Sequence, residues 1–141
     1  MNFYNLRPVN HTHCNDCEDL FMLASRKGWN SANFVKCWMN SDECESFDQF
    51  MSKYHTCGAP YILDILYEKY QDELEEPGEV VPEVFMDWIG GMYRYWVIKE
   101  GISSKELYKI CDLEVMKKAV LWGLNEDPDT AIELIKERYL K

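Results

Sequence analysis

The sequence predicts an all-α fold, and three observations lead to that prediction. Apolar residues recur at three- and four-residue spacing along most of the chain, residues suited to cap helices precede several of these stretches, and no alternating run has the length of a strand. A chain of 141 residues, 47% of them hydrophobic, can bury a substantial core without disulfides or metals. We therefore expect a single domain over residues 1–141 with about seven or eight helices.

The N-terminal half, residues 1–71, contains four stretches with helical spacing. Asn15, Ser31 and Ser41 are suited to cap the first three, and Pro60 suits the first turn of the fourth. The predicted helices cover residues 17–27, 31–40, 42–54 and 60–71.

The C-terminal half, residues 84–141, begins with a long and very apolar helix for which Pro82 is a first-turn residue. Gly90 and Gly91 weaken such a helix, so they indicate either the close approach of another backbone or a kink. Ser103, Asp112 and Asp127 precede three further stretches and are suited to cap them. The predicted helices cover residues 83–100, 104–111, 113–122 and 129–140.

Between the halves, residues 72–83 form an acidic connector. They hold six acidic and no basic side chains, which is more than half of the net charge of −10. Pro77, Gly78 and Pro82 interrupt helices, and like charges extend the chain. A net negative charge disfavours binding to nucleic acid phosphates or to anionic membranes. Mimicry of nucleic acid requires a spread-out array of acids, whereas these are concentrated in one segment.

The N-terminus does not follow the charged-then-apolar pattern of a signal peptide, and no run of apolar residues has the length of a membrane span. We therefore expect a cytoplasmic protein whose six cysteines are reduced thiols. Cys14 and Cys17, beside His11 and His13, are weak candidates for a zinc site, because a second ligand pair with the usual spacing is missing. Partly buried thiols are the alternative, and we expect neither a bound metal nor a cofactor.

Catalysis is not expected. The three histidines, His11, His13 and His55, lie in no nucleophile motif, and no glycine-rich phosphate loop is present. The prediction is a protein that is not an enzyme.

Candidate partner-binding residues lie in the C-terminal half. The run from Tyr93 to Trp96 has the aromatic and arginine composition of interface hot spots, although packing in the core is the commoner role of such aromatics. One helix cannot direct Tyr93, Arg94 and Trp96 to the same side, so at least one of them is expected outside the core. Lys105, beside the Ser103 cap, is the third candidate, with a plain structural cap as the alternative.

Three segments resemble a family of small, uncharacterised Firmicutes proteins. They are WIGGMYRYWVIKEGISSKELY (88–108), NEDPDTAIELI (125–135) and WMNSDECESFDQFMSKYHTCGAPYILDIL (38–66). The likeness covers roughly residues 34–135 and consists of caps, turn glycines and core aromatics. The chain departs from the family at Trp122-Gly123-Leu124, where relatives carry a histidine–threonine pair, so no role is transferred there.

The resemblance implies an antitoxin-like protein from toxin–antitoxin gene neighbourhoods, which binds and neutralises a partner protein by covering its active surface. The partner would be a cognate toxin, and the acidic connector would steer a basic partner toward Tyr93, Arg94 and Lys105. The aromatic content is also compatible with a homodimer. The alternative function is a small zinc-binding structural protein that uses the Cys/His-rich first half.

Overall fold

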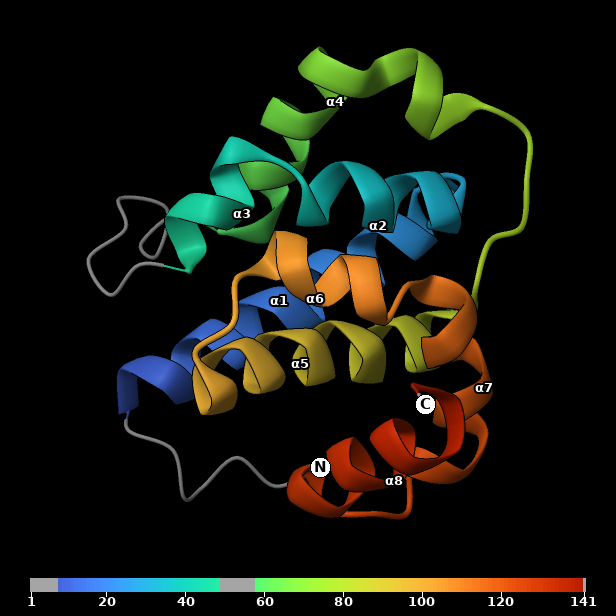
Figure 1. Cartoon of the computed structure of the whole chain (residues 1–141). Coiled ribbons are helices and arrows are strands. Elements are labelled where there is room, and N and C mark those ends of the chain that lie inside the picture. The colour runs from blue at the N-terminus through green and yellow to red at the C-terminus, as the bar shows by residue number, and fades with distance from the viewer. Residues whose placement is uncertain (1–7, 49–57, 141) are drawn as a thin grey trace.

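In the part of the chain that the structure describes, this computed structural model has eight helices and no strands (Figure 1). The structure describes residues 8–48 and 58–140, with side chains from residue 16 onward in the first helix. Within those ranges the all-α prediction and the expected number of helices are confirmed. None of the helices there is both long enough and apolar enough to cross a bilayer. The helices are α1 (Pro8–Arg26), α2 (Ser31–Met39), α3 (Asp42–Phe47), α4 (Ala59–Glu75), α5 (Glu83–Glu100), α6 (Ser104–Ile110), α7 (Leu113–Gly123) and α8 (Pro128–Tyr139).

Capping residues begin four of these helices where the sequence predicted them. The side chains of Ser41, Ser103, Asp112 and Asp127 each accept a hydrogen bond from a backbone N–H three residues ahead. The remainder of the helix predicted over 42–54 lies outside the described residues after Asp48.

Three helix starts differ from the prediction. α1 begins at Pro8, so Asn15 lies inside the helix instead of capping it. Asn30 caps α2 through a 3.0 Å hydrogen bond from the Asn33 N–H, which leaves the Ser31 hydroxyl free for a tertiary contact. Pro82 is the N-cap of α5 and precedes its first turn.

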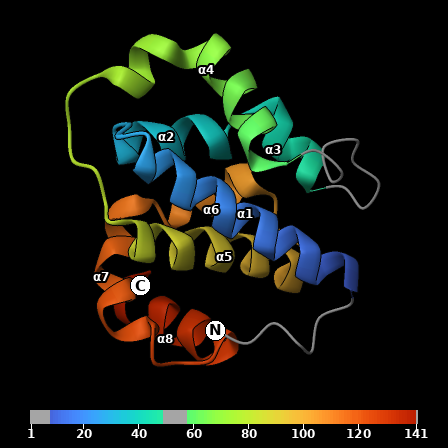
Figure 2. The ribbon, with the colours of Figure 1, turned by 180° about the vertical axis from the view of Figure 1, so that it is seen from behind.

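The two long helices α1 and α5 run antiparallel across the middle of the molecule (Figures 1 and 2). A Cβ atom added at Gly90 would lie 2.5 Å from the backbone oxygen of Cys17 and 2.9 Å from the Phe21 Cβ. Gly90 therefore marks a close approach of two backbones, which is one of the two explanations that the sequence predicted. At Gly91 the neighbour is the side chain of Glu18.

The other helices pack around this central pair. In Figure 1, α4 lies at the top beyond α2 and α3, and α8 lies at the bottom. α4 bends where Tyr70 departs from helical geometry, with φ of −130° and ψ of 27°.

The extended part of the predicted connector is shorter than residues 72–83. Residues 72–75 complete α4, and Glu83 begins α5. The last turn of α4 forms because α2 satisfies its carbonyl groups: the Asn30 N–H donates to the Leu74 oxygen at 3.0 Å, and the Asn33 amide donates to the Glu73 oxygen at 2.8 Å.

Candidate partner-binding surface

Two of the three predicted partner-binding residues lie inside the protein. Tyr93 and Arg94 are only 2% and 3% exposed. The Tyr93 hydroxyl donates to the backbone oxygen of Cys111 at 2.8 Å, which ties α5 to the end of α6. This burial removes both residues from the surface on which the sequence analysis placed them, because an apolar helix at the centre of the fold is covered on nearly all sides.

Arg94 is the centre of a buried polar network. Its Nη1 lies 2.7 Å from Asp48 Oδ1, and its Nη2 donates to the Cys44 sulfur at 3.6 Å. Asp48 also accepts hydrogen bonds from the backbone N–H and the hydroxyl of Ser104, at 3.0 and 2.7 Å. One guanidinium thus joins α5 to α3, while Asp48 occupies the start of α6. This arrangement explains the buried arginine as a structural tie between three helices.

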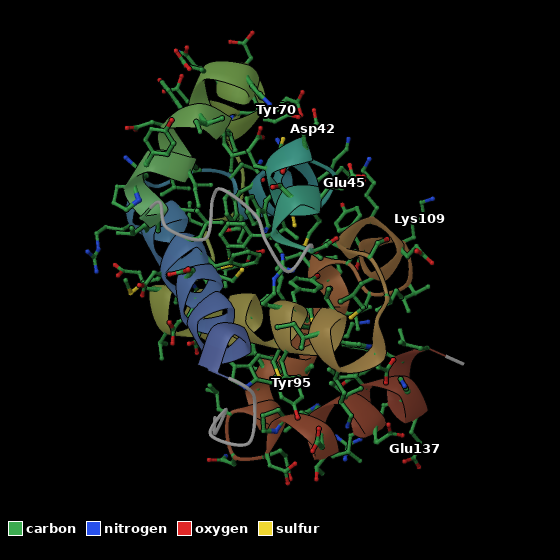
Figure 3. The ribbon with its side chains drawn as sticks, turned by 90° about the vertical axis from the view of Figure 1, so that its left-hand side faces the viewer. Asp42, Glu45, Tyr70, Tyr95, Lys109 and Glu137 are labelled. Carbon is green, nitrogen blue, oxygen red and sulfur yellow. The ribbon has the colours of Figure 1, made fainter. Side chains whose placement is uncertain are left out.

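Trp96 is also buried, so the expectation that at least one of Tyr93, Arg94 and Trp96 lies outside the core is wrong. Tyr95 points from α5 toward α8 (Figure 3), where its hydroxyl donates to Asp129. Lys105 is exposed, and its Nζ lies 3.9 Å from Glu45 on the outer side of α3. An exposed pair of this length contributes little stability, so Lys105 keeps its predicted availability to a partner.

Of the two zinc candidates, the structure describes the side chain of Cys17 and not that of Cys14. The side chains of His11, His13, His55 and Cys57 lie outside the described part as well. Cys17 is 2% exposed and interacts with Arg94, and burial raises the pKa of its thiol. A neighbouring guanidinium and a protonated thiol both oppose binding of Zn²⁺. No group of three metal-binding side chains occurs in the portion searched, which covers the described residues.

Two acidic side chains of α1, Asp16 and Glu18, lie at one edge of the contact between α1 and α5. Burial, with help from Asp87, raises the pKa of Glu18 to about 7. Burial and the charge of Asp19 raise the pKa of Asp16 to about 6. Glu18 is drawn into this position because Gly91 has no side chain to displace it. These two side chains are therefore a source of pH-dependent stability.

The connector, residues 76–82, is held against the corner between α1 and α2. The Ser25 hydroxyl donates to the Val81 oxygen at 2.5 Å, and the Val81 N–H donates to the Ser31 hydroxyl at 2.8 Å. The Ser31 N–H donates to the Glu79 oxygen at 3.0 Å. Val81 itself is 2% exposed. The backbone is consequently fixed, and Glu79 and Val80 project from it as part of a defined surface.

Exposed apolar side chains gather where the connector meets α5 and α7. Six large hydrophobic side chains are exposed in the described residues, and four of them belong to these elements. They are Val80, Val84, Leu121 and Leu124, which are 41%, 62%, 71% and 39% exposed. We call these four residues the connector-end patch.

Two contacts bring the elements of this patch together. Glu79 forms an ion pair with Lys117, which lies one turn before Leu121 on α7. A Cβ atom added at Gly123 would lie 2.4 Å from the indole of Trp88, one turn after Val84 on α5. Figure 1 shows the lower end of the connector arriving at the start of α5 beside α7. The patch therefore occupies one end of the molecule.

Charged side chains of both signs lie beside the connector-end patch. Glu79 and Glu114 share Lys117, Glu83 pairs with Arg26 at 2.9 Å, and the exposed Lys118 lies three residues before Leu121. The ion pairs are partly or largely exposed, so salt and a competing cation can displace them. The surface thus combines exposed apolar side chains with charged neighbours of both signs.

A sequence signal for this patch existed in α7. Leu121 follows Glu114 and Lys117 by seven and four residues, so the three share a helix face whose other members are charged. An apolar residue on a polar face is a candidate for exposure. Val84 carried no such signal, because α5 is apolar on nearly every side.

Comparisons with known proteins identify no relative of this chain. No family model, curated protein or solved structure matches the chain. The resemblance to antitoxin-like proteins therefore stays a prediction, and the candidate surface is argued from its own geometry.

Proposed function

We propose that this chain is a non-enzymatic cytoplasmic protein that binds another protein and neutralises it in the manner of an antitoxin. The observation that carries the proposal is the connector-end patch, in which four of the six exposed large hydrophobic side chains of the described residues lie on adjoining elements. Exposed apolar side chains gathered at one end of a protein, with polar neighbours, are typical of protein–protein interfaces.

The fixed backbone of the connector supports this function. Ser25 and Ser31 hold Val81 in the core, so Val80 is presented on backbone that a partner does not have to order. A pre-organised surface loses less conformational entropy on binding than a flexible loop does.

The charge of the chain indicates the chemistry of the partner. The net charge is −10, and residues 72–83, which lead to the patch, hold six acidic and no basic side chains. A basic protein that exposes apolar side chains is complementary to such a surface. A cognate toxin with a basic active surface is the partner that we propose, and binding would cover that surface.

The experiment is co-expression with the product of the neighbouring gene, followed by co-purification and measurement of Kd. Leu121→Asp and Val84→Asp should each weaken binding at least about tenfold, because they bury a charge at the centre of the interface. Ile110→Asp is the matched control, since Ile110 is also exposed (50%) but ends α6 and is not one of the four patch residues. Higher salt should weaken the wild-type complex.

Failure to bind the neighbouring product, with no rescue of toxicity, would contradict the proposal. Equal weakening by Leu121→Asp and Ile110→Asp would instead show that the partner binds elsewhere. Sedimentation of the isolated chain tests the predicted homodimer, because a dimer that uses this patch should dissociate in the Leu121→Asp variant.

A further inference from the structure

A hollow lies at the opposite end of the connector from the connector-end patch, between the α1–α2 corner and α4. Its volume is about 380 Å³, and it is lined by Lys27, Trp29, Asp64, Tyr67 and Glu75. The Asn30 N–H and side-chain amide donate to the oxygens of Leu74 and Pro77, which places the start of the connector beside Trp29. The hollow is therefore next to residues 76–82 without sharing a residue with the connector-end patch.

An aromatic pair forms one wall of the hollow. The rings of Trp29 and Tyr67 are stacked, with centroids 5.8 Å apart and an angle of 8° between their planes. The Trp29 side chain is almost fully buried, whereas that of Tyr67 is partly exposed. The wall is accordingly rigid, and Tyr67 is its accessible member.

Two carboxylates complete the site. Asp64 is exposed and has no hydrogen-bonding or ion-pair partner among the described residues. The Tyr67 hydroxyl donates to one oxygen of Glu75 at 2.9 Å, and the Gln71 amide donates to the other at 3.3 Å. Each carboxylate oxygen can accept a second hydrogen bond. An aromatic face with nearby carboxylates is suited to a cation.

The protein itself places a cation here. The ammonium of Lys27 lies 5.7 Å from the centroid of the Trp29 ring. Lys27 is exposed, and a lysine side chain has many rotamers, so this ammonium can be displaced at small cost. A planar guanidinium binds such a site better than an ammonium does, since it can stack on a ring and form paired hydrogen bonds to a carboxylate.

We propose that this hollow binds an arginine side chain of the partner protein, with Tyr67 as the stacking surface and Asp64 and Glu75 as the hydrogen-bond acceptors. The inference rests on the proposed function, because it concerns the same partner. Residues 76–82 span at most about 23 Å, so one basic segment can reach the hollow and the connector-end patch together.

The test is an NMR titration of the whole chain with the probe N-acetyl-arginine methylamide, followed through the resonances of the hollow. Saturable shifts at Trp29, Asp64 and Tyr67 are expected, with weaker binding of the lysine analogue. Asp64→Asn should weaken binding about threefold, the size of an exposed ion pair. Asp72→Asn is the matched control on the same helix, and Lys27→Ala should strengthen binding by removing the internal ammonium.

Uniform shifts across the protein, equal shifts with a neutral N-acetyl-norleucine methylamide probe, or no effect of Asp64→Asn would each overturn the inference. The partner complex separates the two proposals. If Asp64→Asn and Tyr67→Leu leave the partner Kd unchanged while Leu121→Asp abolishes binding, the arginine site fails and the proposed function stands. If the hollow variants and Leu121→Asp all weaken partner binding, the arginine site and the proposed function are both supported.

Discussion

Arg94 in α5 and Glu79 in the connector each pair with an opposite charge, but the two pairs lie in different surroundings. The side chains of Arg94 and Asp48 are 2% and 15% exposed, whereas those of Lys117 and Glu79 are 26% and 62% exposed. Inside the protein, water cannot solvate either charge if the pair is broken, so Arg94 and Asp48 stay together and hold three helices in place. At the surface, either partner can exchange its counter-charge for one on another molecule.

The largest expected effect comes from breaking the buried pair. Arg94→Met should lower the free energy of unfolding by about 3 kcal/mol, because Asp48 and Cys44 lose a charged donor. Arg26→Met breaks the exposed pair with Glu83 and should cost less than about 1 kcal/mol. Urea unfolding measures both. Equal losses would contradict the distinction between interior and surface.

The second effect concerns the glycines that allow α1 and α5 to approach. Gly90→Ala should cost about 2 kcal/mol despite the better helix propensity of alanine, because its Cβ meets the Cys17 backbone oxygen. Gly91→Ala meets only the flexible Glu18 side chain and should cost clearly less. Thermal unfolding of the two variants checks this order, and a reversed order would show that the backbones can separate easily.

A smaller effect is expected at the connector. Ser31→Ala leaves the buried Val81 N–H without its acceptor and should cost about 1.5 kcal/mol. Hydrogen exchange of the Val81 amide should accelerate, while the amides of α8 should be unaffected. If exchange at Val81 does not change, the connector is held by other contacts, and the pre-organisation argument fails.

The smallest effect is the pH dependence of the acidic edge. The folded-state pKa of Glu18, about 7, lies above the ordinary value of 4.5, because of burial and Asp87. Its contribution is full below pH 4.5 and is lost as pH rises through 7. The melting temperature should therefore rise when pH falls from about 8 to about 6.

Glu18→Gln isolates this contribution. The variant should gain about 1 kcal/mol at about pH 8, a value discounted because the carboxyl is partly exposed, and should lose much of the pH dependence. Glu137→Gln, on the exposed face of α8, is the control and should keep the wild-type profile. A Glu18→Gln variant with the wild-type slope would assign the dependence to other groups.

Local sequence signals account for much of the fold and little of the site. Ser41, Ser103, Asp112 and Asp127 cap their helices because a cap requires only a side-chain oxygen and the next turn. Ser31 has the same chemistry, yet it accepts the N–H of Val81, fifty residues away. Its role depends on which segment lies beside it.

The sequence by itself determined the all-α class and most helix boundaries, since these follow from periodicity and capping within a few residues. Only the tertiary structure decided that Arg94 is internal, that Gly90 marks a close approach and not a kink, that the acidic connector is fixed, and that Val84 is exposed. Burial of a side chain is set by what other helices cover. On a helix that is apolar all round, such as α5, no local pattern distinguishes the covered residue from the exposed one.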